Sequence, residues 1–115
     1  MPSMGRKITQ FTKKEIDYLF THARRVLKNS AFTLLFSPRQ LDFGRVLIVT
    51  SRAVGNAPER NKIRRRIKSL FYEEKLFEAP FDCAVIVYKK AKELSFEQLK
   101  EIILNVYRKE QDKER

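Results

Sequence analysis

Hydrophobic and polar residues follow a helical period near both ends of the chain. After a capping-box pattern at Thr12–Glu15, apolar residues recur every three or four positions, which predicts a helix over roughly residues 12–22. Ser95 and Gln98 form a similar helix start further along. The apolar positions of this last helix are Leu99, Ile102, Ile103 and Val106. Two amphipathic helices are therefore expected to flank the middle of the chain.

Three apolar runs between these helices have the composition of buried strands. The run at 31–36 ends in a turn-like segment that contains Pro38 and Gly44. The runs at 45–51 and 83–89 are rich in β-branched residues, which predicts strands that are buried on both faces.

A third helical pattern, from about Pro58 to Lys75, combines an apolar stripe with dense positive charge. Proline suits the first turn of a helix, where its missing N–H is not needed. The residues expected to face the core are Ile63, Ile67, Leu70 and Phe71. The residues expected on the opposite face and its flank are Asn61, Arg64, Arg65, Lys68, Lys62 and Arg66.

The order of elements predicts one small α+β domain, an α/β sandwich with helices over a mixed sheet. The strand–helix–strand unit that joins 45–51 to 83–89 is its central part. We expect a flexible N-terminus over 1–10, the domain over 11–108 and a frayed polar tail over 109–115.

Charge narrows the class of partner. The chain has 25 Lys and Arg against 14 acidic residues, a net charge of +11, which favours a polyanion such as nucleic acid. No apolar run is long enough to cross a bilayer, and the N-terminus lacks the apolar segment of a signal peptide. The single cysteine, Cys83, offers neither a disulfide nor metal-ligand spacing and fits a reducing cytoplasm.

The basic helix places like charges four residues apart, for example Arg60 with Arg64 and Arg64 with Lys68. Each such pair destabilises an isolated helix by about 0.2–0.5 kcal/mol, so a bound anion is the expected compensation. Guanidinium groups suit phosphate because they donate two hydrogen bonds in one plane. The alternative is a solvated face kept for solubility, although interspersed charges serve solubility better than one block.

The segment SRAVGNAPERNKIRRRIKSLF, residues 51–71, resembles the signature of the bacterial ribonuclease P protein family, and the likeness covers roughly residues 11–108. Phe20 and the segment ELSFEQL before the last helix extend it. The matching positions are Ser51, Arg52, Val54, Gly55, Asn56, Ala57, Arg60, Asn61, Ile63, Arg64, Arg65 and Ile67. The positions that depart from the family pattern are Ile16, Leu35, Ala53, Pro58, Glu59 and Lys62.

The resemblance implies the protein component of a ribozyme. In that family a catalytic RNA removes the 5′ leader of precursor tRNA, while the protein binds this RNA and the leader and broadens the substrate range. It also implies a ribosomal-protein-domain-like fold with a left-handed βαβ crossover, against the usual right-handed rule. Mg²⁺ is then held mainly by the RNA, no cofactor is held by the protein alone, and no obligate protein partner is expected.

Carried over by position, the resemblance assigns two groups of residues. The expected RNA-binding residues are Arg52, Gly55, Asn56, Arg60, Asn61, Lys62, Arg64, Arg65 and Lys68. Ile16, Phe20 and Leu35 are expected to line the leader cleft, although a Phe next to Leu19 at helical spacing also suits a core. Val54-Gly55-Asn56 forms either a close approach to RNA or a simple strand-to-helix turn.

Arg24 and Arg25 follow the first helix and either steer phosphates or are scattered surface charge. No catalytic residue is expected in the protein itself. His22 lacks a partner for acid–base chemistry, and Cys83 has the surroundings of a small buried hydrophobe. The carboxylates of Glu73, Glu74 and Asp82 lack the spacing of a metal site.

Three other functions are weighed against this one. A structural RNA-binding protein of ribosomal type would share the basic helix without a role in cleavage. A self-sufficient nuclease would need an acid–base or metal constellation that the sequence lacks. A helix-turn-helix DNA-binding protein would need a second helix directly before the basic one, where 45–51 predicts a strand.

Overall fold

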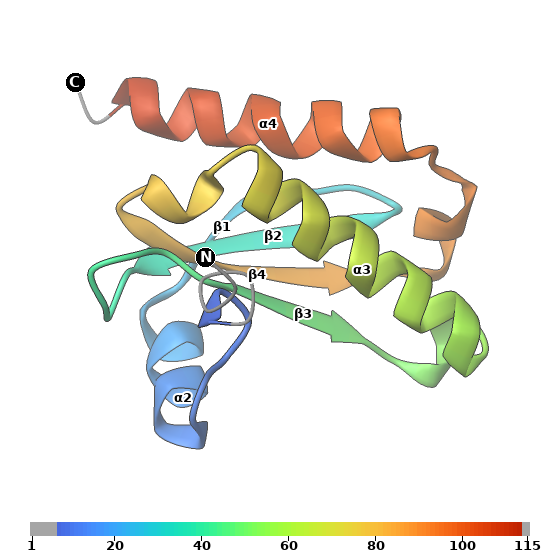
Figure 1. Cartoon of the computed structure of the whole chain (residues 1–115), viewed down its shortest axis with the longest axis horizontal. Helices are drawn as coiled ribbons and strands as arrows, with labels where there is room; N and C mark the ends of the chain where they lie inside the picture. The colour runs from blue at the N-terminus through green and yellow to red at the C-terminus, as the bar shows by residue number, and fades with distance from the viewer. Residues whose placement is uncertain (1–6, 114–115) are drawn as a thin grey trace.

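The computed structural model describes residues 7–113, which form a four-stranded mixed sheet and three longer helices (Figure 1). The strands are β1 (Arg24–Lys28), β2 (Phe32–Pro38), β3 (Val46–Thr50) and β4 (Phe81–Val87). The helices are α2 (Lys13–His22), α3 (Ala57–Glu73) and α4 (Phe96–Lys113), with short 3₁₀ turns η1 (Arg52–Val54), η2 (Leu76–Glu78) and η3 (Lys89–Glu93). The predicted α+β class is confirmed.

The sheet order β1-β2-β4-β3 makes β1 and β3 the two edges. β2 pairs antiparallel with both β1 and β4, whereas β3 and β4 are parallel. Parallel neighbours need a crossover connection, which α3 supplies. In Figure 1 the chain leaves β3, passes in front of the sheet as α3 and returns to β4. This arrangement makes the crossover left-handed.

Successive side chains of each strand point to opposite faces of the sheet, so the molecule has one packed layer on each face. Phe32, Leu34 and Phe36 of β2 point toward α3 and α4 and belong to the main core. Tyr107 of α4 is part of the same layer, since its ring contacts Phe36 at a centroid distance of 4.8 Å. This layer contains most of the buried apolar side chains.

The other face of the sheet is covered only in part. Leu19 of α2 and Ala84 of β4 are fully buried but lie apart from the main core. Leu35 shares their side of the sheet, because it pairs directly with Ala84 in the antiparallel ladder. The short helix α2 therefore covers one end of this face and leaves Val49 of β3 exposed.

Several boundaries differ from the sequence-based expectation. Strand β1 was not predicted, because its polar sequence RRVLK pairs as an edge strand with little burial. β4 begins at Phe81 and not at residue 83. The prediction that β3 is buried on both faces is wrong, because β3 is an edge strand in which Val46 alone is buried and Val49 is exposed.

The two ends of the chain also hold more structure than expected. Ile8 is fully buried and its carbonyl oxygen accepts from the N–H of Val46 at 2.8 Å, so the predicted flexible segment is wrong at this position. Residues 1–6 of that segment lie outside the described residues. The tail was expected to fray from 109, but α4 continues to Lys113 because Glu110 is buried against Arg24.

Candidate nucleic-acid interface

The basic helix α3 begins at a well-formed cap. The side chain of Asn56 accepts from the N–H of Glu59 at 2.9 Å, and the Glu59 carboxylate accepts from the N–H of Asn56 at 2.9 Å. This hydrogen bond from the Asn56 backbone is the main reason that the pKa of Glu59 is lowered. Glu59 departs from the family pattern, but its carboxylate completes the capping box at the N-terminus of α3.

The close approach of Glu59 also accounts for the glycine before the cap. A Cβ atom on Gly55 would lie 2.5 Å from Oε1 of Glu59. Gly55 has an extended backbone with φ of 161°, so its conformation does not require glycine, but a side chain here would displace the Glu59 carboxylate from its hydrogen bond to the N–H of Asn56. The alternative of a strand-to-helix turn is confirmed for this segment, since η1 and the cap connect β3 to α3. RNA contact by Gly55 and Asn56 remains a prediction.

The two predicted faces of α3 are confirmed. Its four apolar residues Ile63, Ile67, Leu70 and Phe71 are buried in the main core. On the outer side, Asn61, Lys62, Arg64 and Arg65 are exposed, while Arg66 and Lys68 are half-buried. The tertiary fold therefore keeps the polar face of the helix outside the main core.

The cations of α3 lack partners of opposite charge within residues 7–113. None of the ion pairs of this part of the chain involves a basic residue between Arg60 and Lys68. Arg60 donates one hydrogen bond to the carbonyl oxygen of Gly55 at 2.7 Å, which fixes its side chain near the helix start. Charges left unpaired by the protein itself can bind the phosphates of a nucleic acid.

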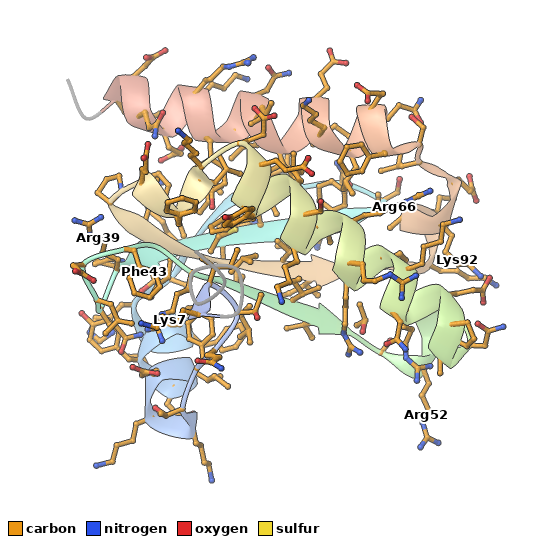
Figure 2. All side chains as sticks on the ribbon, viewed as in Figure 1. Lys7, Arg39, Phe43, Arg52, Arg66 and Lys92 are labelled. Atoms are coloured by element: carbon orange, nitrogen blue, oxygen red, sulfur yellow. The ribbon has the colours of Figure 1, made fainter. Side chains whose placement is uncertain are left out.

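Arg52 extends the basic surface beyond the helix start. It is exposed in η1 and points away from the body of the molecule (Figure 2). Lys92 lies at the same end but forms an ion pair with Glu59 at 3.4 Å. Arg52 thus adds an exposed cation near the end of the molecule where α3 begins.

The three residues expected in the leader cleft come from α2 and β2. Ile16 and Phe20 lie one helical turn apart, and Leu35 is half-buried on the sheet face that α2 partly covers. Phe20 is 43% exposed and Leu19 takes the buried position, so the alternative of a core role for Phe20 is wrong. An exposed aromatic ring is available to stack on a base.

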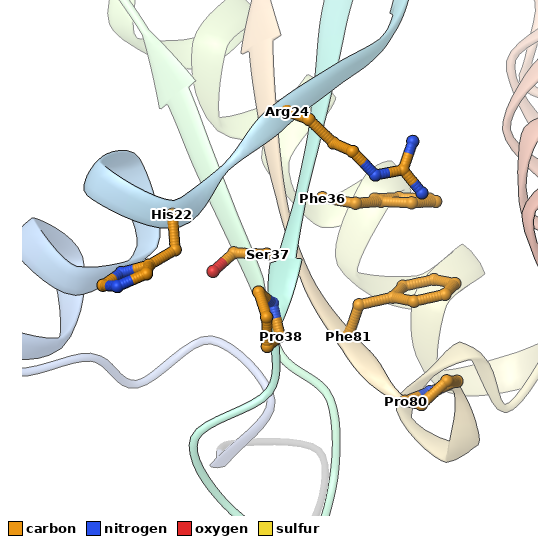
Figure 3. Close-up of a pocket in the computed structure, with 7 residues that line it drawn as sticks. All are labelled: His22, Arg24, Phe36, Ser37, Pro38, Pro80 and Phe81. Atoms are coloured by element: carbon orange, nitrogen blue, oxygen red, sulfur yellow. The ribbon is translucent and has the colours of Figure 1, made fainter.

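A hollow of about 330 Å³ lies beside the C-terminal end of α2 (Figure 3). Arg24 lies over the ring of Phe36 there, and it also pairs with Glu110 of α4. Arg24 thus has a structural role in β1 through its contact with Glu110. Sequence analysis did not predict this contact. The residues that line the hollow are His22, Arg24, Phe36, Ser37, Pro38, Pro80 and Phe81.

His22 and Cys83 lie in surroundings that do not suit acid–base or nucleophilic catalysis. Nδ1 of His22 lies 2.9 Å from the carbonyl oxygen of Tyr18, and its ring stacks on the Tyr18 ring. Burial raises the pKa of the Cys83 thiol to about 12, so it stays protonated at neutral pH. Among residues 7–113 no three His, Cys, Asp or Glu side chains form a group able to hold a metal ion.

Arg45 is a central residue that sequence analysis did not single out. Its side chain is only 1% exposed and donates to the carbonyl oxygen of Gln10 at 2.8 Å and to Glu15 at 2.9 Å. Its backbone N–H donates to Asp82 at 2.8 Å. The only sequence signal was an arginine directly before an apolar run, and that signal does not reveal the partners.

Fold and surface together define a small α+β domain with a basic, unpaired helix face, the kind of protein that binds a polyanion. The ribonuclease P family model matches residues 4–111, and this chain belongs to that family. It is 36% identical over 85 residues to the ribonuclease P protein component of Bacillus velezensis, with 72% of each chain covered. It is 39% identical over 74 residues to that of Thermotoga petrophila, covering 64% of this chain and 62% of the relative.

Solved structures agree with this assignment. The ribonuclease P protein of Thermotoga maritima superposes with a TM-score of 0.74 at 27% identity, covering 88% of this chain and 96% of that one. The Staphylococcus aureus protein matches in fold with a TM-score of 0.75, covering 88% and 93% of the two chains. The chain is thus a protein component of ribonuclease P, a partner of the ribonuclease P RNA. None of the described helices is long and apolar enough to cross a membrane.

Proposed function

We propose that this chain acts as the accessory subunit of ribonuclease P, binding the catalytic RNA through α3 and the 5′ leader of precursor tRNA through α2 and β2. The catalytic RNA then performs the hydrolysis with Mg²⁺ that it holds itself. The observation that carries the proposal is the face of α3, whose cations have no ionic partner in the described part of the chain.

The RNA face uses Arg52 and the polar side of α3. Arginine forks at Arg64 and Arg65 suit pairs of phosphate oxygens, whereas Lys62 and Lys68 act as point charges. Phosphate contacts of this kind position a protein on RNA and supply most of its affinity. The stiff helix holds the cations in fixed relative positions because its opposite face is packed in the core.

The leader site combines an exposed aromatic ring with an apolar strand. Single-stranded RNA is bound mainly by stacking of its unpaired bases on such surfaces. Phe20 supplies the ring, while Ile16 and Leu35 supply the apolar surroundings. We expect each base stacked here to contribute about 1–3 kcal/mol.

The decisive experiment is cleavage of a precursor tRNA by a bacterial ribonuclease P RNA at low Mg²⁺, with and without this protein. We expect correct 5′ cleavage only when both are present, because the protein lowers the demand for cations. Cleavage by the protein alone would overturn the accessory role. Tight RNA binding without stimulation would instead support a structural RNA-binding protein of ribosomal type.

A paired substitution locates the RNA face. Replacing both Arg64 and Arg65 by alanine should reduce affinity for the catalytic RNA by at least about tenfold, as expected for lost phosphate contacts. The matched control replaces Arg108 and Lys109, two exposed cations of α4, by alanine. This control should have little effect on affinity for the catalytic RNA. Equal losses in both double variants would mean that only total charge matters.

Leader binding has its own test. The Phe20→Ala variant should bind precursor tRNA with an eight-nucleotide leader about tenfold more weakly, with no change for a tRNA that has a one-nucleotide leader. Tyr18→Ala removes another exposed aromatic ring from α2 and serves as the control. If Phe20→Ala weakens both substrates equally, Phe20 does not contact the leader.

A further inference from the structure

A groove of about 310 Å³ lies between the edge strand β3 and the basic helix α3. Its volume is at the lower end of the range for small-ligand sites, about 300–1,000 Å³. Apolar β3 residues form one wall and α3 cations form the other. The residues that line it are Thr9, Val46, Leu47, Ile48, Arg64, Arg65 and Lys68.

The free edge of β3 offers backbone hydrogen-bonding groups to this groove. The N–H of Val46 points away from β4, because it donates to the carbonyl oxygen of Ile8 at 2.8 Å. Alternate residues of a strand point their N–H and C=O groups to the same edge, so those of Ile48 also face outward. Within residues 7–113 neither group of Ile48 has a hydrogen-bond partner.

The positive charge of the α3 wall indicates which kind of molecule binds in the groove. Arg64, Arg65 and Lys68 face the groove with no ionic partner in the described part of the chain. A second copy of this chain could add a strand at the β3 edge, but each copy carries a net charge of +11 and the two would repel. A strand of RNA has the opposite charge and carries flat bases with polar edges.

We propose that this groove holds one unstacked nucleotide of an RNA strand. The base lies against the apolar side chains of β3, with its polar edge on the N–H and C=O of Ile48, and its phosphates contact the α3 cations. Contacts of this kind read a base without any side-chain donor. The inference rests on the proposed function and deepens it, since it gives α3 a base-binding site in addition to phosphate contacts.

The test compares two RNA probes of equal charge. One is a uridine octamer with a single central 4-thiouridine, and the other is an octamer of abasic ribose phosphates. The Thr9→Trp variant fills the groove with an indole while it retains every cation, and Thr9→Ser is the matched control. Binding of each probe is measured by fluorescence anisotropy, and the thiouridine is photo-crosslinked to wild-type protein and mapped by mass spectrometry.

We expect Thr9→Trp to bind the uridine octamer about tenfold more weakly, with unchanged affinity for the abasic octamer, because one stacked base is worth about 1–3 kcal/mol. Crosslinks in the wild-type protein should fall on residues 46–48. Crosslinks confined to other elements, or an equal effect of Thr9→Trp on both probes, would overturn the proposal. Concentration-dependent dimerisation that Thr9→Trp abolishes would instead assign the edge to a second copy.

These outcomes are independent of the accessory role. If the catalytic RNA is not stimulated but thiouridine still crosslinks to 46–48, the groove binds a base and the proposed function fails. If the catalytic RNA is stimulated and the groove shows no base-dependent binding, the proposed function stands and only this inference fails. The wild-type crosslink map decides the question even if Thr9→Trp does not fold.

Discussion

Arg45 shows how one buried charge joins the parts of the molecule that carry the proposed leader site. Its guanidinium donates to Gln10 and Glu15 near the start of α2 and lies 3.6 Å from the Asp82 carboxylate of β4. It also lies 4.1 Å from the centre of the Phe11 ring, a cation–π contact. Arg45 thereby holds α2 against the sheet.

Replacing Arg45 by methionine should lower the free energy of unfolding by about 3 kcal/mol, because it removes the cation beside the buried Asp82 carboxylate. Burial already raises the pKa of Asp82, so the loss should shrink in acid, where this carboxyl takes up a proton. Urea unfolding at neutral and acidic pH measures both effects. The control is Lys7→Met, an exposed cation beside Arg45, and a loss as large in that variant would contradict the explanation.

At the scale of elements, the start of α3 is fixed by its own cap before any RNA binds. The reciprocal hydrogen bonds of Asn56 and Glu59 satisfy N–H groups that the helix cannot pair internally. The resemblance to the family predicted Asn56 as an RNA contact, and that role stays a prediction. Its structural role is separate and can be measured without RNA.

The Asn56→Ala variant should lose about 1 kcal/mol of stability through the lost cap. Asn56→Asp keeps an acceptor at the same position and should stay close to the wild-type protein. Chemical denaturation of the three proteins measures the difference. If aspartate costs as much as alanine, the side chain contributes through something other than the cap.

Glu110 links the end of α4 to β1, since its carboxylate accepts a hydrogen bond from Arg24. This bond is the main cause of its lowered pKa. A carboxylate with a lowered folded-state pKa stabilises the fold above its ordinary value of 4.5 and loses that contribution as pH falls further. The wild-type protein should therefore lose more stability below about pH 4.5 than Glu110→Gln does. Parallel pH profiles of thermal unfolding would contradict this contribution.

At the scale of the whole molecule, the proposed site for the catalytic RNA and the proposed leader site lie on opposite sides of the sheet. The α3 cations lie on the side of the molecule where that helix covers the main core, while Phe20 and Leu35 belong to the other side of the sheet. One protein can thus contact the catalytic RNA and a leader with separate surfaces. The unpaired charge of α3 should make the first contact strongly dependent on salt.

Affinity for the catalytic RNA should fall steeply with salt, by about a hundredfold or more between 50 and 200 mM if four to six phosphates are contacted. The double Arg64→Ala and Arg65→Ala variant should reduce the slope of log affinity against log salt by about two. Filter binding over a salt series measures both slopes. A variant slope equal to that of the wild-type protein would exclude these arginines from phosphate contact.

The sequence predicted α3 well because its signals are local. Ile63 and Ile67 lie one turn apart, so helical geometry alone places them on the buried face and Arg64 and Lys68 away from it. The motif around Arg60 also identified the family. The same local rules missed β1, since an edge strand with a polar sequence is stabilised by its neighbour β2 and not by its own pattern.

By itself, then, the sequence determined the basic amphipathic helix, the α+β class and the family, since each depends on periodicity, composition or a contiguous motif. Tertiary structure alone decided that Arg45 meets Asp82, 37 positions away, and that Glu110 meets Arg24. It also decided that Phe20 is exposed while Leu19 is buried, because burial depends on which face of α2 meets the sheet. Contacts between distant segments are set by packing, which spacing along the chain does not encode.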